Sequence, residues 1–258
     1  MSKPKFRCSG LSHLMTEPKS AADKAAGNLS EGAKVHALNT WISHTYKRRE
    51  EVYSKYLEKG NETEEDSITL VSLAYGVFLK KNETFVENDW ICGTPDLFTG
   101  PELMKAETIR DTKSSYDIYT FLRTKQKGLP DSNYWQIQCY CWLTGAKVGY
   151  VDYCLNNATP DLILDELRKV RWAMRTTDSD ESPEFVKRAR MIERLMIYDL
   201  PGFRKRYPNF DLYTEVEKWE YDVPQEQRIH TFEIEAKQSE QELIKRKVEK
   251  AWEYMESL

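Results

Sequence analysis

The sequence predicts an α/β protein, in which a central sheet flanked by helices is followed by a mainly helical C-terminal part. Two observations favour this class. Candidate strands crowd between residues 83 and 155, whereas segments before and after that region carry helix signals. The composition, with 40% hydrophobic and 31% charged residues in a chain of 258, suits a globular protein with one sizeable core.

The N-terminal half is expected to contain two long helices. Residues Ser30–Lys59 carry an apolar stripe that includes Trp41, and Gly60 would end the helix. Residues Glu62–Tyr75 form the second helix, which would end at Gly76 because glycine suits a helix C-terminus.

Strands are predicted next, with one helix among them. A helix is expected at Asn133–Leu143, stopped by Gly145. The last strand candidate is rich in Val and Tyr, as strands are. The four candidates are Glu83–Glu87, Asp89–Cys92, Glu107–Lys113 and Lys147–Leu155.

After Asn156 the pattern becomes mainly helical. The segments expected are the helix Asp161–Arg175, the polar linker Thr176–Glu181, the helix Ser182–Tyr198 and the strand Arg228–Glu235. Ser239 and Glu242 have capping-box spacing and would start a last helix. We therefore expect residues 157–258 to pack on the same domain.

Charge and cysteine usage narrow the class of protein. There is no long apolar run and no apolar segment near the N-terminus, so we expect neither a membrane span nor a secretory signal. The five cysteines form no Cys-x-x-Cys pair, which predicts free thiols in a reducing cytoplasm. A net charge of −4 argues against a general nucleic-acid coat protein, although local basic groups keep a nuclease open.

Two acidic motifs carry the chemistry. Asp96 follows Thr94-Pro95, and Asp111 is separated from Lys113 by a single residue. On a strand, Asp111 and Lys113 would point to the same face. Two carboxylates and an ammonium in this pattern can hold a divalent metal ion beside a phosphate.

A third acid lies on the helix Glu62–Tyr75. Glu64 shares a helix face with Ile68 and Val71, whereas Glu65 faces the wet side. An inward carboxylate is costly unless it is paired, and a metal ion would offset that cost. The alternative is a solvated acidic run.

The helix Asn133–Leu143 carries Gln136 one turn before Tyr140. Gln136 is a candidate site residue. The alternative is that the aromatic residues anchor the helix while Gln136 and Gln138 lie on the surface.

The order of these motifs resembles a known group of nucleases. Gly60-x-x-x-Glu64, Thr94-Pro95-Asp96, Asp111-x-Lys113 and Gln136-x-Gln138-x-x-x-Trp142-x-Thr144 occur in the order typical of the PD-(D/E)XK nuclease superfamily, and within it of the phage lambda exonuclease-like group. The resemblance covers roughly residues 1–156. It implies a restriction-endonuclease-like core in residues 1–156, with a helical extension in residues 157–258.

The resemblance also implies roles for the site residues. Mg²⁺ would be the cofactor, with Mn²⁺ able to substitute. The implied metal ligands are Glu64, Asp96, Asp111 and the backbone carbonyl of Thr112. Lys113 would orient or activate the attacking water, and Gln136 would position Lys113 or that water. The strand Ile109–Lys113 is more polar than the central strand of such a sheet usually is, which leaves its central position open.

Candidate DNA contacts lie outside the acidic motifs. The segment Arg7-Cys8-Ser9-Gly10-Leu11-Ser12 resembles the opening of the same group, where a Ser caps a helix near the DNA end. Arg7 and Ser9 are candidates to bind a terminal 5′-phosphate, because helix N-termini with a nearby Arg bind phosphates well. A simple helix cap by Ser9 is the alternative. Arg123 and Lys125, in the basic run 123–127, are candidates for contacts with the phosphate backbone. The alternative for this run is a solvated loop.

The implied activity is that of a metal-dependent exonuclease which resects linear double-stranded DNA in phage-type recombination, working with a single-strand annealing protein. Processive members of the group form rings, so a homo-oligomer stays open. Two other functions remain as alternatives. One is a structure-specific or nicking endonuclease in repair or defence, and the other is a DNA-binding accessory protein without catalysis.

Overall fold

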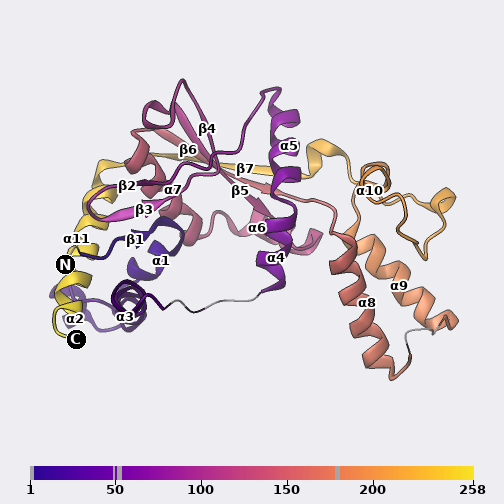
Figure 1. Ribbon diagram of the computed structural model, residues 1–258, viewed down its shortest axis with the longest axis horizontal. Coiled ribbons are helices and arrows are strands. Elements are labelled where there is room, and N and C mark those ends of the chain that lie inside the picture. The colour runs from indigo at the N-terminus through magenta and orange to yellow at the C-terminus, as the bar shows by residue number, and fades with distance from the viewer. Residues whose placement is uncertain (1–2, 49, 51–53, 178–180) are drawn as a thin grey trace.

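The computed structural model describes residues 3–48, 50, 54–177 and 181–258. Within them, the centre is a four-stranded mixed sheet (Figure 1). Its strands are, in spatial order, β4 (Leu97–Thr99), β5 (Thr108–Ser114), β6 (Val148–Cys154) and β7 (Ile229–Glu235). Strands β5 and β6 run parallel, and the two outer strands are antiparallel to their neighbours. The mixed α/β class that the sequence predicts is confirmed.

Strand β5 is central despite its polar composition, because its polar side chains find partners inside the protein. Arg110 Nη1 donates to both carboxylate oxygens of Asp152, at 2.9 and 2.7 Å. The guanidinium also lies over the rings of Tyr75 and Tyr150. The ion pair and the ring contacts replace the water that Arg110 loses on burial.

Two helices cover opposite faces of this sheet. Consecutive side chains of β5 point to opposite faces. Accordingly, Arg110 contacts Tyr75 of α5 (Glu64–Tyr75), whereas Asp111 contacts Gln136 of α7 (Asp131–Thr144). Gly149 lets α7 approach closely, because a Cβ there would lie 2.3 Å from a methyl carbon of Ile137.

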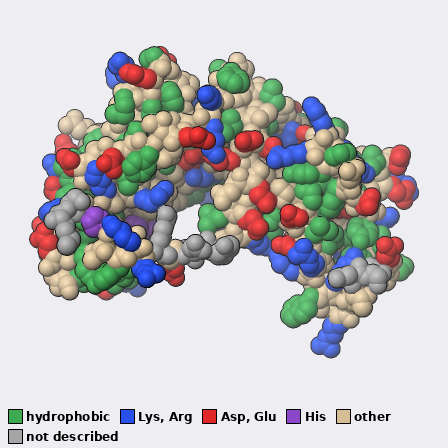
Figure 2. All heavy atoms as spheres, in the orientation of Figure 1, with side chains coloured by type: hydrophobic (Ala, Val, Ile, Leu, Met, Phe, Trp, Pro, Cys, Tyr) green, Lys and Arg blue, Asp and Glu red, His purple; other side chains and the backbone are tan. Residues whose placement is uncertain are grey.

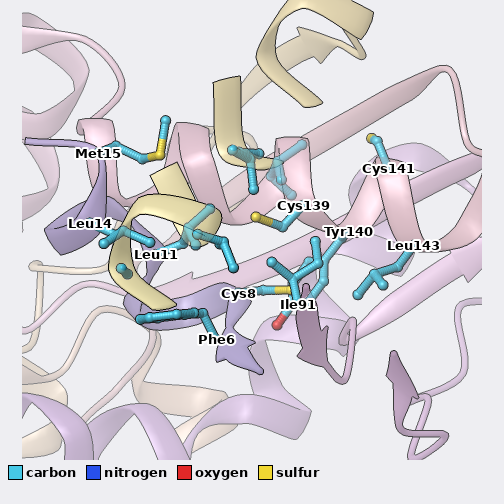
Figure 3. Packing of buried hydrophobic residues seen from close by; sticks show 14 of the residues in the cluster. Phe6, Cys8, Leu11, Leu14, Met15, Ile91, Cys139, Tyr140, Cys141 and Leu143 are labelled. Carbon is cyan, nitrogen blue, oxygen red and sulfur yellow. The ribbon is translucent and has the colours of Figure 1, made fainter. Parts of the chain in front are cut away.

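The N-terminal region and the C-terminal helix share one core. A small sheet orders β1 (Phe6–Arg7), β3 (Ile91–Gly93) and β2 (Val86–Glu87). The 3-10 helix η1 (Cys8–Gly10) and the helices α1 (Leu11–Leu14), α2 (Ala21–Ala25), α3 (Glu31–Tyr46) and α11 (Gln238–Met255) lie around it (Figure 1). Figure 3 shows Cys8 and Leu11 of this region lying beside Cys139 and Tyr140 of α7. The Trp252 indole N–H of α11 donates to the carbonyl of Pro4 at 2.8 Å, so the two ends of the chain meet.

A second apolar cluster lies in the part of the chain between β6 and β7. Its helices are α8 (Pro160–Met174), α9 (Pro183–Met196) and α10 (Leu200–Arg206), which stand to the right in Figure 1. Helices α4 (Lys55–Glu62) and α6 (Ile118–Lys127) lie between this lobe and the N-terminal helices. Three short 3-10 helices complete the described elements: η2 (Leu103–Lys105), η3 (Val216–Lys218) and η4 (Gln225–Gln227). A domain boundary after residue 156 stays a prediction.

Several predicted elements differ from the observed ones. The expected helix Ser30–Lys59 is two helices, α3 and α4, and residues 49 and 51–53 between them lie outside the described residues, as do 178–180 of the expected polar linker. The strand expected at Glu83–Glu87 is reduced to Val86–Glu87. Strands β1 and β4 and helices α6 and α10 were not predicted.

The predicted capping box of the last helix is wrong. Helix α11 has Lys237 at its N-cap, without a side-chain cap. The helix starts earlier because the buried side chain of Gln138 holds the preceding turn. Its amide oxygen accepts from the Lys237 N–H at 3.0 Å, and its NH₂ donates to the carbonyl of Glu235 at 2.8 Å. Gln138 is therefore a buried structural residue rather than a surface one.

Two further expectations can be compared with the structure. All five cysteines are free and buried, as predicted. No helix in the described part of the chain is long and apolar enough to cross a membrane.

Candidate active site

Asp111, Lys113 and Gln136 form the centre of the candidate site. Asp111 and Lys113 lie on the α7 face of β5, as strand alternation predicts, and their charged groups are 2.6 Å apart between Nζ and Oδ2. Gln136 bridges them. Its NH₂ donates to Asp111 Oδ1 at 2.8 Å and to the Tyr140 hydroxyl at 3.1 Å, while its Oε1 accepts from Lys113 Nζ at 3.2 Å. Every polar atom of the Gln136 side chain is thereby engaged.

Asp96 joins this group from the turn between β3 and β4. Its Oδ2 accepts the backbone N–H of Thr112 at 2.9 Å, so Thr112 reaches Asp96 through its amide. The buried side chain of Asn82 fixes the turn. Its Nδ2 donates to the carbonyl of Pro95 at 2.8 Å, and its backbone N–H donates to the carbonyl of Asp96 at 2.7 Å.

The close packing under the turn requires a glycine. A Cβ at Gly93 would lie 2.8 Å from a ring carbon of Tyr140 and 3.1 Å from the sulfur of Cys8. The motif Gly93-Thr94-Pro95-Asp96 thus sets Asp96 against the helix that carries Gln136 and Tyr140.

The acidic pair lies in an environment that opposes its charge. Burial, and then the negative charge of Asp111, raise the pKa of Asp96 to about 7. Burial also raises the pKa of Asp111, although Lys113 opposes the shift. Asp111 Oδ2 is buried, and among the described residues its charged partner is the ammonium of Lys113. Burial lowers the pKa of Lys113, but the charge of Asp111 and the hydrogen bond with it outweigh burial and raise it.

Glu64 lies at the N-terminus of α5. Its charge acts on Asp96 and Asp111, but its ion pair is with a lysine outside that group. Glu64 is half-buried, whereas Glu65 is exposed, as the helix faces predict. Its carboxylate pairs with Lys81 at 2.6 Å. The charge of Glu64 nevertheless contributes to raising the pKa values of Asp96 and Asp111. Among the described residues, no three acidic, His or Cys side chains are close enough together to hold a metal ion.

Arg7 and Ser9 line a separate open pocket of about 740 Å³, together with His13, His36 and His44. Arg7 lies in strand β1 and pairs with Cys92 of β3. The chain continues from β3 into the turn that carries Asp96. Ser9 caps no helix. The N-cap of α1 is Gly10, and η1 has Arg7 at its N-cap, so the helix-cap alternative for Ser9 is wrong.

Arg123 and Lys125 lie on α6, so the basic run is helical rather than a loop. Both are exposed, and neither makes an ion pair among the described residues. Lys125 is close enough to His230 of β7 for its charge to help lower the pKa of that imidazole, after burial. For Arg123, the described residues show no hydrogen bond or ion pair with Asp96 or Asp111.

Figure 2 shows the molecule hollowed between the N-terminal helices and the part that contains α4 and α6, with Asp and Glu side chains gathered above the hollow. Lys113 is the accessible member of the buried group, with 31% of its side chain exposed against 1% for Asp111.

Sequence reasoning missed Asn82, Lys81 and Tyr153. Nothing in the sequence around Asn82 and Lys81 signals a site, because their role depends on how the loop after α5 packs on the turn at Asp96. Tyr153 carried a usable signal, since it lies on a predicted strand at a position that can pair with Lys113.

Solved structures of exonucleases have a similar fold. No family model matches the chain, and no curated protein does. Among solved structures, a phage-related exonuclease from Haemophilus somnus 129PT is similar over 98% of this chain and 94% of that chain, with a TM-score of 0.67 and 28% identity. The alkaline exonuclease LHK-Exo from Laribacter hongkongensis is similar over 98% and 88%, with a TM-score of 0.56 and 12% identity, and so is its complex with dAMP.

These likenesses extend over nearly the whole chain, and they include the lobe between β6 and β7 for which no motif was found. The chain has the fold of the lambda exonuclease-like nucleases of the PD-(D/E)XK superfamily, as its motifs predict.

Proposed function

We propose that this protein is a Mg²⁺-dependent deoxyribonuclease, and specifically an exonuclease that resects linear double-stranded DNA. The observation that carries the proposal is the buried carboxylate of Asp111, which lies with Asp96 beside a lysine. Its Oδ2 contacts the Lys113 ammonium at 2.6 Å, and its charge helps to raise the pKa of Asp96, in a fold shared with exonucleases. Two carboxylates crowded into one site oppose each other's charge and cost the fold stability, so such a pair is typical of a functional site.

The donor set fits a hard divalent cation. Mg²⁺ is usually held by one or two carboxylates together with phosphate oxygens of the substrate, and Asp96 and Asp111 supply the two carboxylates. Glu64 would join them if its ion pair with Lys81 opened. When bound, Mg²⁺ would supply positive charge against the phosphate and lower the pKa of a coordinated water. Mn²⁺ offers similar charge and accepts oxygen ligands, so it should substitute.

The protein's own residues position the reactants. Lys113, held by Asp111 and Gln136, can donate to a phosphate oxygen or to the attacking water. Gln136 keeps Asp111 and Lys113 at a fixed separation, because one amide group contacts both. The N–H of Thr112 fixes the Asp96 carboxylate. Preorganisation of this kind lowers the barrier because little rearrangement is needed when charge develops on the phosphate.

We also propose a setting in phage-type recombination, with a single-strand annealing protein as partner. The support is the phage-related exonuclease among the similar structures.

The test is digestion of a linear duplex that carries a 5′-phosphate and a different label on each strand. Wild type is compared in Mg²⁺ and in EDTA, and Lys113→Ala is compared with wild type in Mg²⁺. The matched control is Lys80→Ala, because Lys80 is exposed and makes no ion pair among the described residues. We expect mononucleotides from one strand only, abolished by EDTA and reduced at least 100-fold by Lys113→Ala, with Lys80→Ala unchanged.

Other outcomes would revise the proposal. Internal cuts with the same Mg²⁺ and Lys113 dependence would make the protein an endonuclease. A lack of Mg²⁺-dependent cleavage on linear, nicked and branched DNA would refute the nuclease and leave a DNA-binding accessory protein.

A further inference from the structure

Three strands place a row of polar side chains beside Lys113. In the register of the central sheet, Lys113 lies opposite Tyr153 on β6, and Tyr153 lies opposite His230 on β7. Directly paired residues point to the same face of a sheet. The row therefore starts at the candidate active site and crosses the α7 face of the sheet, away from Asp111.

Two helices add groups to this row. Asn133, in the first turn of α7, donates from Nδ2 to the hydroxyl of Tyr153. Lys125 of α6 lies near the His230 end, where its charge is felt by the imidazole. Tyr153, His230 and Asn133 are half-buried and Lys125 is exposed, so the row is open to solvent along part of its length.

Beyond Lys113, the row offers hydrogen-bond donors that no carboxylate of the described residues binds. The Tyr153 hydroxyl accepts from Asn133, which leaves its own proton to donate, and in the described residues it makes no other hydrogen bond. Neither Lys125 nor His230 forms an ion pair with a carboxylate in the described part of the chain. The neighbouring residues of β7, Thr231 and Glu233, point to the opposite face, where Thr231 donates to Asp152.

A packing role accounts for only part of the row. The Tyr153 ring contacts Phe232 edge to face, and His230 contacts the same ring. Those contacts use the rings, and within the described residues they leave the proton of the Tyr153 hydroxyl and the imidazole N–H without an acceptor. The row is also about 10 Å long over three strands, too long for one phosphate at Lys113 to contact both ends.

We propose that Tyr153, Asn133, His230 and Lys125 form a second phosphate subsite, which binds the phosphodiester adjacent to the scissile one on the cleaved strand. The inference rests on the proposed nuclease function and adds to it a named place for the neighbouring phosphate. The subsite favours a phosphodiester because it combines several N–H and O–H donors with the positive charge of Lys125.

The experiment pairs protein variants with DNA in which single phosphates are neutral. Duplexes carry one methylphosphonate linkage, moved stepwise along the cleaved strand from the scissile position. The variants are Tyr153→Phe and Lys125→Gln. The matched controls are Tyr150→Phe, on the opposite face of the same strand, and Lys127→Gln, two residues along α6. KM and kcat are measured in Mg²⁺, and thermal unfolding verifies that each variant is folded.

We expect Lys125→Gln and Tyr153→Phe each to raise KM about tenfold with little change in kcat, as loss of a charge-assisted hydrogen bond would. A methylphosphonate adjacent to the scissile phosphate should raise the wild-type KM similarly. When a variant is combined with that methylphosphonate linkage, KM should rise no further than it does with either change alone. Lys125→Gln should also lower the slope of log affinity against log salt by about 1.

Additive effects at every linkage, or no effect of the two variants relative to their controls, would overturn the inference. Failure of the proposed function looks different, because wild type would then cleave none of the duplexes. In that case, the affinity for the same duplexes is measured by fluorescence anisotropy in Ca²⁺. The subsite is supported if the affinity losses from the variant and from the methylphosphonate are not additive, and refuted if they are.

Discussion

The Asp96 carboxylate destabilises the fold when it is ionised, because its surroundings oppose the negative charge. Its carboxyl has a pKa of about 7, against an ordinary value of 3.8, first because it is buried and then because Asp111 is near. Between these two pH values the folded protein binds more protons than the unfolded chain. The contribution of Asp96 to stability therefore falls as pH rises from about 4 to 7.

Replacement of this carboxylate should stabilise the metal-free protein. Asp96→Asn keeps an oxygen to accept the Thr112 N–H but cannot ionise. We expect its Tm in EDTA at pH 8 to exceed that of wild type by about 3 °C, with the difference shrinking at pH 4. The control is Asp89→Asn, an exposed acid that should show no pH-dependent difference. A variant less stable than wild type at pH 8 would contradict the argument.

At the scale of single residues, the sequence predicts contacts made within one element better than contacts between loops. Strand alternation predicts that Asp111 and Lys113 share a face, and helical spacing predicts that Glu64 is less exposed than Glu65. Neither strand alternation nor helical spacing predicts the ion pair of Glu64 with Lys81, because a helix and a loop separate the two residues along the chain. The same holds for the hydrogen bonds of Asn82.

At the scale of elements, a buried lysine ties the ends of two central strands to α4. Lys59 Nζ donates to the carbonyls of Ser115, Tyr116 and Asn156 at 2.9, 2.9 and 3.0 Å. These carbonyls lie just beyond β5 and β6, where no ladder partner remains for them. Burial lowers the pKa of Lys59 to about 7, but three acceptors match the three N–H donors of the ammonium form.

Loss of this amine should be costly because it leaves the carbonyls buried without their donor. We expect Lys59→Met to lower the free energy of unfolding at pH 6 by about 3 kcal/mol, measured by urea denaturation with an unchanged m-value. Lys80→Met is the control, since Lys80 is exposed and should change stability by less than about 0.5 kcal/mol. Equal stability of the two variants would show that water replaces the amine.

Elements whose ends carry clear start or stop residues are predicted from the sequence, whereas a very short strand and a helix with a basic run are not. Strand β6, helix α7 and helix α9 lie close to their predicted bounds. Strand β4 has only three residues, too few for alternation to be recognised. Helix α6 buries only Phe121 among its side chains, so its basic run resembles a solvated segment. The start of α11 depends on Gln138, a residue one hundred positions earlier whose effect no local pattern contains.

At the scale of the whole molecule, the lobe of α8, α9 and α10 is inserted between two adjacent strands of the central sheet. The chain leaves after β6 and returns as β7, and the Leu155 N–H donates to the Arg228 carbonyl at 2.8 Å where the two strands meet. Asn157 Oδ1 accepts the N–H of Tyr198 at 2.7 Å, and Arg206 of α10 pairs with Asp66 of α5. The lobe is thus anchored at its entry, at its exit and along α5.

This anchoring predicts that the two apolar clusters unfold together. Ile244 of α11 and Ile163 of α8 are both fully buried, one in each cluster. Ile244→Ala and Ile163→Ala should each remove about 3 kcal/mol of stability and lower the Tm by roughly 6–12 °C. If the lobe is part of one cooperative unit, calorimetry will give a single endotherm that both variants shift by similar amounts. An independently folding lobe would instead give two transitions, with Ile163→Ala shifting only one. The lobe would then contribute nothing to the stability of the sheet that holds Asp111 and Lys113, although the chain on both sides of it belongs to that sheet.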